Sequence, residues 1–444
     1  MGASVSIDSF SNRHHRSPGS SVPTELPGIA TGPLRLVYLD GLRGLAALYV
    51  VLHHLHREIT YRLDLPHAVL VGTKWLQLGH CAVDVFIVLS GYSLMLPIAR
   101  SGRRRLDGGF KTFVVRRARR ILPPYYAALL MTMIIVLATP SFQTPVGWRS
   151  DGEIPSSITG SVLSHLVLLH NLSPGWCSSL NSPMWSIAVE AQIYLLFPLL
   201  LLPIWRVLGL RLLIASALVL GLAPHFLFSG NADYTIPWYI GLFAMGMAGA
   251  VVGFSIEDRL VRVQRQTPWI YCALLMGGGA GLITKMRPDL QWVIDPMVGA
   301  ATVCFIADCT RHFFMPCARR PLVLRVLEAR WAVFLGTISY SLYLTHSPLI
   351  SLVHLGLRRL HPSPIQRLVI LPILVLPSVF VVALLFHLCF ERPFLSLAGR
   401  PRAVVGWSGG AEFGASTTSP VEYGERPEGA QIEPSPALMP EGGP

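Results

Sequence analysis

The sequence predicts an all-α fold, a polytopic membrane helix bundle of about ten transmembrane helices with both termini in the cytoplasm. Charged residues make up only 14% of the 444 residues and hydrophobic residues 52%, whereas roughly 25% of residues are charged in an average soluble domain. The apolar residues lie in long unbroken runs, unlike the weak alternation of a membrane β-barrel. We therefore expect a multi-pass integral membrane protein, in the plasma membrane or, in a bacterial source, the inner membrane.

Ten apolar runs account for the predicted transmembrane helices, and interruptions by Pro and Gly are tolerated within such bundles. Basic residues concentrate in the loops that follow the even-numbered runs, and the loop 99–120 alone carries nine Lys and Arg. Because cytoplasmic loops are enriched in Lys and Arg, this pattern orients both termini to the inside. The approximate limits of the runs are 37–56, 78–98, 121–140, 184–204, 208–228, 236–254, 269–284, 292–309, 331–355 and 368–390.

The formal net charge of +12 would also suit a nucleic-acid-binding protein. The enrichment of basic residues in inner loops accounts for this charge, so we expect contact with membrane lipid and none with nucleic acid. The seven cysteines form no CxxC pair and lie mostly in or beside apolar runs. This spacing indicates neither a metal cluster nor a disulfide framework, and we expect no bound metal.

The two ends of the chain differ in composition from residues 35–400. Residues 1–34 are rich in Ser, Pro and Gly, and no apolar run follows Arg13 and Arg16, which argues against a secretory signal peptide. Residues 401–444 are rich in Pro, Gly and Glu. Such segments bury too little apolar surface to offset the entropy that ordering removes. We expect both ends to be disordered and residues 35–400 to form one membrane domain.

The first apolar run carries ionisable residues at helical spacing. Arg43 and His54 are eleven residues apart, which is about 20° beyond three full helical turns, so the two side chains share a face. Their separation along the helix axis is about 16 Å. Asp40 falls near the same stripe, whereas His53 points roughly 80° away. Ionisable residues inside a membrane helix are a functional hypothesis by default. The alternative is a buried polar stripe that only fixes helix packing; three matched residues favour a function.

The segment from Leu39 to Gly44, with ten residues between Arg43 and His54, resembles the opening of the acyltransferase-3 family of integral membrane acyltransferases (O-acetyltransferase type). Further stretches resemble the family's later motifs in the same order, and together they cover residues 36–394. Two positions depart from the family pattern, Tyr92 where Phe is commoner and Thr345 where an aromatic residue is usual. The matching stretches are Asp84–Tyr92, which includes the candidate Ser90, then Arg116–Tyr125, Pro183–Glu190, Ser339–His346 and Glu391–Phe394.

The resemblance implies transfer of an acyl group, usually acetyl, from acyl-CoA to a hydroxyl of a carbohydrate or secondary metabolite, without a permanently bound cofactor. His54 is then the expected general base, a role that suits histidine. Arg43 matches the family's paired arginine and either binds a donor phosphate or stabilises charge on the thioester oxygen. We expect direct attack by the hydroxyl, with a covalent intermediate on His54 as the alternative.

Glu190, Asp84 and His346 each have two interpretations. Glu190 is spaced with Ser186 and Tyr194 at i, i+4 and i+8, so these three side chains line one side of a helix. A carboxylate in that position requires a partner or a task. It either forms a structural ion pair or orients the catalytic base or the acceptor hydroxyl. The same alternatives apply to Asp84 and His346.

The basic segment 99–120 also has two interpretations. Arginine side chains suit the phosphates of CoA, but such clusters often only set topology or contact anionic lipid. We expect Arg116, Arg117 and Arg120, with Tyr125, to bind the donor, because they adjoin the predicted start of a helix at residue 121.

Two other classes of function fit parts of the sequence. In a secondary transporter or channel, the intramembrane ionisable residues would line a proton or substrate path. A catalytically silent receptor or flippase of the same fold is the second class, and the presence of both Arg43 and His54 argues against it. Within residues 35–400, no Ser or Cys lies in a nucleophile motif such as GxSxG. The acceptor and the membrane face at which transfer takes place stay open.

Overall fold

The structure is a computed structural model that describes residues 34–60, 66–102, 104–139, 158–314, 320–361 and 363–396. All regular elements among these residues are helices and none is a strand, so the predicted all-α class is confirmed. The two segments predicted to be disordered lie outside the described residues, apart from Leu34.

The elements are, in order, α1 (Val37–Thr60), α2 (His67–Gly72), η1 (Lys74–Leu78), α3 (Gly79–Ser101), α4 (Gly109–Ala138), α5 (Ile158–Leu166), η3 (His170–Leu172), α6 (Pro174–Cys177), α7 (Met184–Leu196), η4 (Phe197–Leu201), α8 (Leu202–Leu227), η5 (Asp233–Thr235), α9 (Tyr239–Phe254), α10 (Asp258–Gln266), α11 (Trp269–Met286), α12 (Gln291–Phe314), α13 (Leu322–Leu327), α14 (Arg330–Arg358), α15 (Pro364–Phe386), η6 (His387–Glu391) and α16 (Arg392–Ser396).

Seven helical stretches of the described residues are long and apolar enough to cross a membrane. α1 and α14 are as long, but polar side chains such as Arg43 and His346 lower their mean hydropathy. The longest of the seven, Met184–Leu227, joins two predicted spans, and Gly209 interrupts its helical geometry with a φ of +80°. Each predicted span has a helical counterpart, while the number of membrane crossings stays a prediction. The seven stretches are Lys74–Ser101, Gly109–Ala138, Met184–Leu227, Asp233–Phe254, Trp269–Met286, Gln291–Phe314 and Ile365–Leu395.

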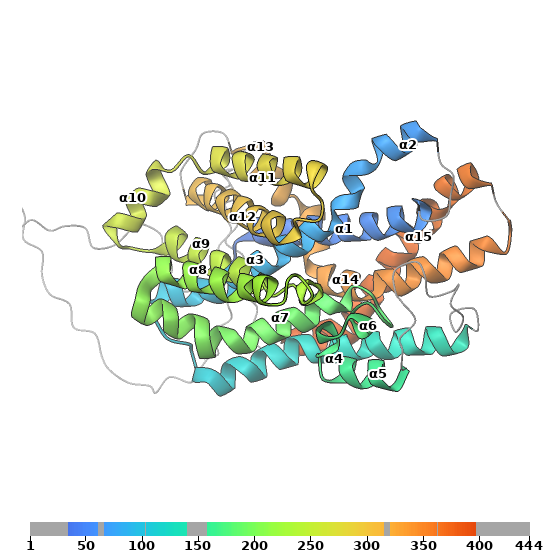
Figure 1. Cartoon of the computed structure of the whole chain (residues 1–444), viewed down its shortest axis with the longest axis horizontal. Helices are drawn as coiled ribbons and strands as arrows, with labels where there is room; N and C mark the ends of the chain where they lie inside the picture. The colour runs from blue at the N-terminus through green and yellow to red at the C-terminus, as the bar shows by residue number, and fades with distance from the viewer. Residues whose placement is uncertain are drawn as a thin grey trace, which may run out of the picture. The chain divides into compact units, whose positions relative to one another are not determined.

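The long helices pack side by side, with α1, α3 and α9 in the interior (Figure 1). α1 packs mainly against α14 and also against α3, while α9 contacts α3, α8 and α12. α3 and α9 are buried over most of their length, whereas Ala280 is the single fully buried residue of α11. The polar residues of α1 and α3 therefore lie in the most enclosed part of the bundle.

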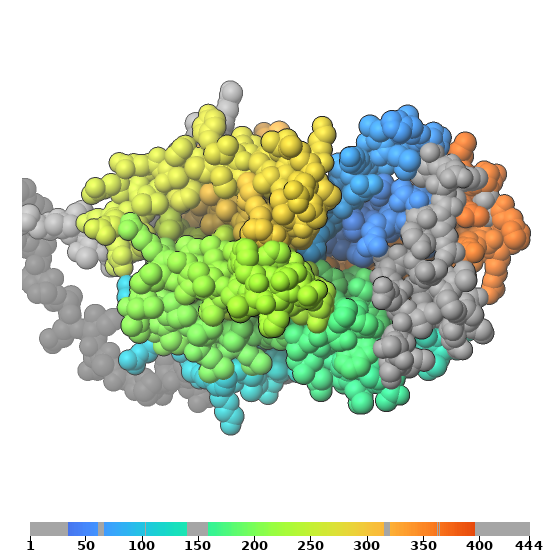
Figure 2. Space-filling model, viewed as in Figure 1, coloured from blue at the N-terminus to red at the C-terminus, as the bar shows by residue number. Residues whose placement is uncertain are grey.

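The outer helices present apolar side chains to their surroundings. Figure 2 shows a face that includes α8, α11 and α12, coloured green to yellow. Val219, Tyr271 and Leu275 on these helices are exposed. Exposed apolar side chains of this size, if gathered in a patch, promote association of a soluble protein, whereas lipid chains cover them in a bilayer. This surface agrees with the predicted membrane location.

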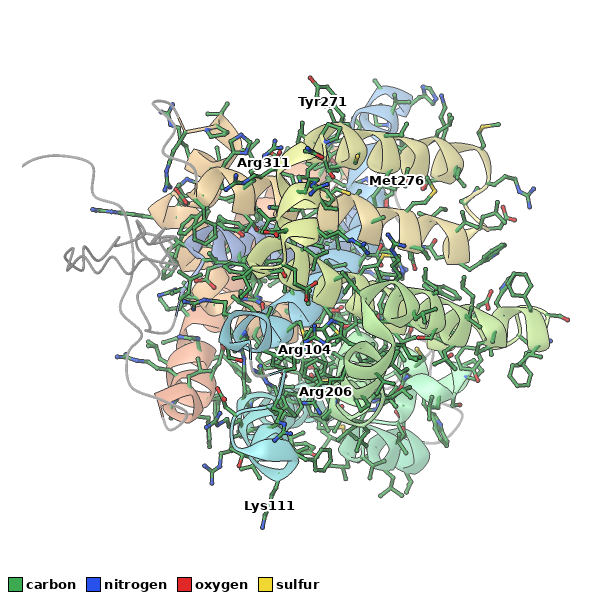
Figure 3. The ribbon with its side chains drawn as sticks, turned by 90° about the vertical axis from the view of Figure 1, so that its left-hand side faces the viewer. Arg104, Lys111, Arg206, Tyr271, Met276 and Arg311 are labelled. Carbon is green, nitrogen blue, oxygen red and sulfur yellow. The ribbon has the colours of Figure 1, made fainter. Side chains whose placement is uncertain are left out.

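Basic side chains gather on one side of the molecule, which we call the basic end. It is defined by Arg104, Lys111, Arg206 and Arg311, which come from three parts of the chain and lie on the side of the molecule that Figure 3 turns toward the viewer. Arg206 donates a hydrogen bond to the Arg104 carbonyl at 2.5 Å, and Arg104 pairs with Glu257 at 3.1 Å. α3 ends and α4 begins here, so the opposite end holds the start of α3.

Two histidines in the connection between α4 and α7 predict a pH-dependent stability. His165 and His170 are fully buried and stacked, with ring centroids 3.8 Å apart. Burial disfavours the charged imidazole, which lowers the pKa of His165 to about 4; burial and the neighbouring His165 lower the pKa of His170 to about 3. In the unfolded chain both imidazoles bind a proton below the ordinary histidine pKa of about 6.5, whereas the folded protein keeps them neutral. The stability of the folded protein is therefore full above that pH and falls as the pH drops toward 4.

Thermal unfolding measured from pH 7.5 to 4.5 checks this expectation. His165→Phe combined with His170→Phe should flatten the fall in unfolding temperature, because neither ring then titrates. His361→Asn, which changes an exposed histidine, should leave the fall unchanged. An equal slope in the double variant and in the unaltered protein would show that other groups cause the acid sensitivity.

Candidate active site

Close helix contacts position α1. Gly44 lies against the backbones of Ala332 and Gly336, and Gly336 in turn lies against the backbone of Asp40. Small residues let helix backbones approach closely in a membrane bundle. α1 therefore packs tightly on α14, and its polar side chains reach α3 and α14 instead of lipid.

Arg43 reaches the interior of the bundle from the first turns of α1. Its guanidinium lies 3.4 Å from the Ser93 hydroxyl of α3 and 3.5 Å from Asp40 Oδ1. Asp40 is also paired with Arg35 at 2.7 Å, so it helps to hold both arginines. Arg43 further interacts electrostatically with Glu190 of α7. Asp40 is thus a partner of Arg43, one turn away on the predicted stripe.

Glu190 is held by two hydroxyl groups. Ser90 of α3 donates to Glu190 Oε1 at 2.5 Å, and Tyr194, one turn along α7, donates to the same oxygen. The predicted alignment of Glu190 with Tyr194 is therefore present. Ser186, one turn the other way, is hydrogen-bonded to the Tyr343 hydroxyl of α14 at 2.7 Å. α7 consequently ties α3 to α14 through polar side chains.

Arg117 and Arg120 of α4 complete a set of three arginines, the arginine cluster, with Arg43. The three interact electrostatically with one another, and Arg117 also interacts with Glu190. The Arg117 guanidinium lies 5.9 Å from the centre of the Tyr194 ring. Its buried Nε has no hydrogen-bond partner within the described part of the chain. The arginine cluster is therefore a concentration of positive charge with donor capacity to spare.

The predicted helix start at residue 121 is wrong, because α4 begins at Gly109 and Pro123 lies inside the helix. The apolar pattern marks where a helix enters the membrane, and long Arg side chains on the preceding turns can keep their charges in water. Arg116 is exposed. The Tyr125 hydroxyl donates to the His165 carbonyl at 2.9 Å, which joins α4 to α5. The structure brings neither of these two residues into the arginine cluster.

His54 and His346 lie together further along α1 and α14. Their ring centroids are 5.0 Å apart, and both side chains are buried. His346 Nδ1 lies 3.1 Å from the Leu342 carbonyl, which fixes the ring against its own helix. His53 is directed elsewhere, with Nδ1 2.8 Å from the Leu76 carbonyl and 3.3 Å from the Gly79 amide. The two adjacent histidines therefore have different surroundings, as their helical spacing predicts.

Tyr343 was not singled out from the sequence, although it lies in a matched motif. Its hydroxyl donates to the Pro183 carbonyl at 3.0 Å, in addition to its bond with Ser186. Its ring centroid is 5.9 Å from that of His346 and 5.9 Å from that of Phe86. Tyr343 therefore forms part of the wall beside the two histidines.

Glu391 is a second functional candidate that only the structure identifies. It accepts a hydrogen bond from Ser341 at 2.6 Å and lies 2.9 Å from His387 Nδ1. The signal for it was the closing Glu391–Phe394 motif, in which the carboxylate follows a long apolar run. Its partners come from α14 and η6, so it links the end of α15 to the helix that carries His346.

Asp84 lies in a different part of the bundle. It is fully buried, and its ionisable neighbours are His80, one turn earlier on α3, and Asp295 of α12. The structure therefore does not place Asp84 with the arginine cluster, and it is separate from the groups around Glu190.

The fold and these side chains define a class of protein: a multi-pass membrane helix bundle with ionisable groups in its interior, which suits a membrane enzyme or a transporter. The model of the acyltransferase-3 family, described as an acyltransferase domain, matches residues 36–392. The chain therefore belongs to the acyltransferase-3 family, and the resemblance of its motifs is confirmed. Membership favours the enzyme over the transporter.

Several bacterial proteins named as O-acetyltransferases are similar to this chain. The chain is 25% identical over 381 residues to the "Peptidoglycan O-acetyltransferase OatA" of Listeria monocytogenes, a match that covers 80% of this chain and 55% of that protein. It is 26% identical over 348 residues to the "Putative peptidoglycan O-acetyltransferase YrhL" of Bacillus subtilis, covering 71% and 48%. The chain thus spans about half the length of these relatives. No solved structure is significantly similar to it.

Proposed function

We propose that this protein is a membrane O-acyltransferase that moves an acetyl group from acetyl-CoA to a hydroxyl of a carbohydrate. The observation that carries the proposal is the arrangement along α1. Arg43 belongs to the arginine cluster, and His54, packed against His346, lies about 16 Å further along the axis. CoA has its phosphates and its thioester at opposite ends of a long arm, so a basic site and a histidine separated along one buried helix suit this donor.

In the proposed reaction, His54 removes the proton from the acceptor hydroxyl as its oxygen attacks the thioester carbonyl carbon. The new C–O bond forms and the C–S bond breaks. The CoA thiolate leaves and takes up the proton from the His54 imidazolium, so the base is regenerated. This route needs no covalent enzyme intermediate. Family membership and the O-acetyltransferase names of the relatives support the same reaction class.

Glu190 acts in this proposal as a positioning residue for the arginine cluster. Ser90 and Tyr194 fix one of its oxygens, and Arg43 and Arg117 are both within electrostatic range. A carboxylate held in this way keeps two guanidinium groups close together despite their like charge. The cluster can then bind phosphate with donors that are already oriented.

The basic end is the cytoplasmic side in this proposal, since inner loops of membrane proteins are enriched in Lys and Arg. Arg104, Lys111, Arg206 and Arg311 lie on this side (Figure 3). Acetyl-CoA is a cytoplasmic compound, so the donor would enter at the same side as the arginine cluster.

Acetyl transfer by the purified full-length protein in detergent tests the proposal. The assay supplies radiolabelled acetyl-CoA with either a peptidoglycan-type disaccharide or a hexose oligosaccharide, and measures free CoA and O-acetyl ester together. We expect equal amounts of CoA and ester with at least one acceptor. CoA release without ester in every case would reject the carbohydrate acceptor, and no CoA release at all would reject the acyltransferase.

Arg117→Ala is expected to raise the apparent KM for acetyl-CoA by about 10- to 100-fold, because a hydrogen bond to a charged group contributes about 1.5–3 kcal/mol. The KM for the acceptor should change little. Arg119→Ala is the matched control, since Arg119 is exposed and lies about 160° round the helix from Arg117. If both variants keep the donor KM of the unaltered protein, the α4 arginines serve topology or lipid contact instead.

A further inference from the structure

A second polar cluster lies at the opposite end of the bundle from the basic end, where α3, α9 and α12 meet. We call it the His80 cluster: His80 and Asp84 of α3, Asp295 of α12, and Trp238 and Tyr239 at the start of α9. One ligand atom from each of His80, Asp84 and Asp295 lies within 4.8 Å of the other two. The proposed transfer reaction uses none of these residues.

Asp295 is buried and held by three donors. Its Oδ2 accepts a hydrogen bond from Trp238 Nε1 at 2.8 Å and lies 2.9 Å from His80 Nε2. Its Oδ1 accepts from the Gln291 side-chain amide at 2.6 Å. These contacts fix both the position and the orientation of the carboxylate, as is usual for a metal ligand with outer-shell partners.

Asp84 is also fully buried, yet neither of its carboxylate oxygens has a hydrogen-bond partner among the described residues. Its Oδ1 is 4.0 Å from His80 Nε2, which is beyond hydrogen-bond distance. The Tyr239 hydroxyl lies 3.1 Å from His80 Nε2 and also interacts with the Asp84 carboxylate, although not within ideal hydrogen-bond geometry. A protonated His80 is the one cation nearby, but Nε2 carries a single hydrogen, and Asp295 Oδ2 at 2.9 Å lies much closer to it than Asp84. Asp84 is then a buried carboxylate without a hydrogen bond, which is strongly unfavourable.

A proton on Asp84 is the simplest cation, but it fits poorly. The second carboxyl oxygen would still be buried without a hydrogen-bond donor in the described part of the chain. A metal ion fits better, because ligand atoms about 2.1 Å from a shared ion lie about 3.0–3.4 Å from one another. The His80–Asp295 separation of 2.9 Å is close to that range, and the His80–Asp84 separation of 4.0 Å needs to shorten by less than about 1 Å.

We propose that His80 Nε2 and the carboxylates of Asp84 and Asp295 bind one divalent transition-metal ion, Zn²⁺ or Mn²⁺. One imidazole with two carboxylates is a donor set that suits these ions. His80 is partly exposed, so an ion can reach the site from the end of the bundle. The ion joins the start of α3 to α12, and Trp185 of α7 stacks on the His80 ring at 5.8 Å. The site thus ties three helices together. A bound ion here differs from the expectation, based on the cysteine pattern, that the protein binds no metal.

Metal content and thermal stability of the full-length protein in detergent test this site without any activity assay. The protein is treated with a chelator, freed of it, and then given Zn²⁺ alone or Mn²⁺ alone. We expect one bound ion per chain after desalting and a rise in unfolding temperature, because a ligand that binds only the folded state stabilises it.

Asp84→Asn and Asp295→Asn are each expected to weaken metal binding by more than about 100-fold, since even the loss of an outer-shell partner typically costs 10- to 100-fold. Asp84→Asn removes a buried charge, so it should fold at least as well as the metal-free protein. Asp233→Asn is the matched control, because Asp233 pairs with His225 at 2.8 Å, outside the His80 cluster; it should bind metal normally. If the unaltered protein binds no more metal than Asp84→Asn, the proposal is overturned and the cluster holds a proton.

Discussion

His54→Ala is expected to lower kcat for acetyl transfer by about 10²- to 10⁴-fold, the usual contribution of a general base. The side chain is buried beside His346 and lies about 16 Å along α1 from Arg43, where the thioester of a phosphate-anchored donor would reach. Removing the imidazole leaves both the arginine cluster and the α1–α14 contact in place. The KM for acetyl-CoA should therefore stay within a few-fold of its original value, and the unfolding temperature should change little.

His53→Ala is the matched control, and the structure predicts a different kind of damage. His53 contacts the Leu76 carbonyl and the Gly79 amide, so it holds η1 and the start of α3 against α1. We expect a lower unfolding temperature with kcat largely retained in the molecules that stay folded. Both variants are assayed for CoA release, ester formation and unfolding temperature. Equal, partial losses of kcat in the two variants would contradict the assignment of His54 as the base.

Helical periodicity was sufficient to predict the surroundings of the α1 residues. Asp40, Arg43 and His54 share a stripe by spacing alone. In the structure Asp40 pairs with Arg43, Arg43 reaches α3, and His54 packs on α14, while His53 faces η1. A helix repeats every 3.6 residues whatever packs around it, so the sequence determines which side chains share a face. The identity of the neighbouring helix is a tertiary property, and this is why Tyr343 escaped notice.

Two features could not be predicted from local pattern. The start of α4 was misplaced because its first turns are basic, and the apolar run that signals a membrane segment begins only after them. The His80 cluster joins residues that are 215 positions apart in the chain, so no motif spacing indicates it. The position of Asp84 within an apolar run makes it a candidate from the sequence. Its proposed role depends on Asp295, which comes close to it only because α3 packs against α12.

Gly336→Ala is expected to destabilise the protein and to lower activity by about 10²-fold, although alanine is the better helix former by about 1 kcal/mol. A Cβ on Gly336 would overlap the backbone of Asp40. Backbone atoms cannot rotate out of the way, so α1 must shift along or away from α14. Overpacking of this kind typically costs about 1–3 kcal/mol. A shift of about 1 Å in the position of a reacting group can cost about 10²-fold in rate, and α1 carries both Arg43 and His54.

Gly281→Ala tests whether the site, and not the substitution itself, causes the effect. Gly281 is an exposed residue of α11, and a Cβ there would meet no atom within 4 Å. The same change should therefore leave activity intact and raise stability by up to about 1 kcal/mol, since glycine is unfavourable inside a helix. Unfolding temperature and kcat are measured for both variants in the same detergent. A lower stability and kcat in Gly336→Ala, with a higher stability in Gly281→Ala, would show that the close approach of α1 and α14 holds the catalytic residues in position. If Gly336→Ala instead leaves stability and kcat unchanged, the two helices can separate without loss of function.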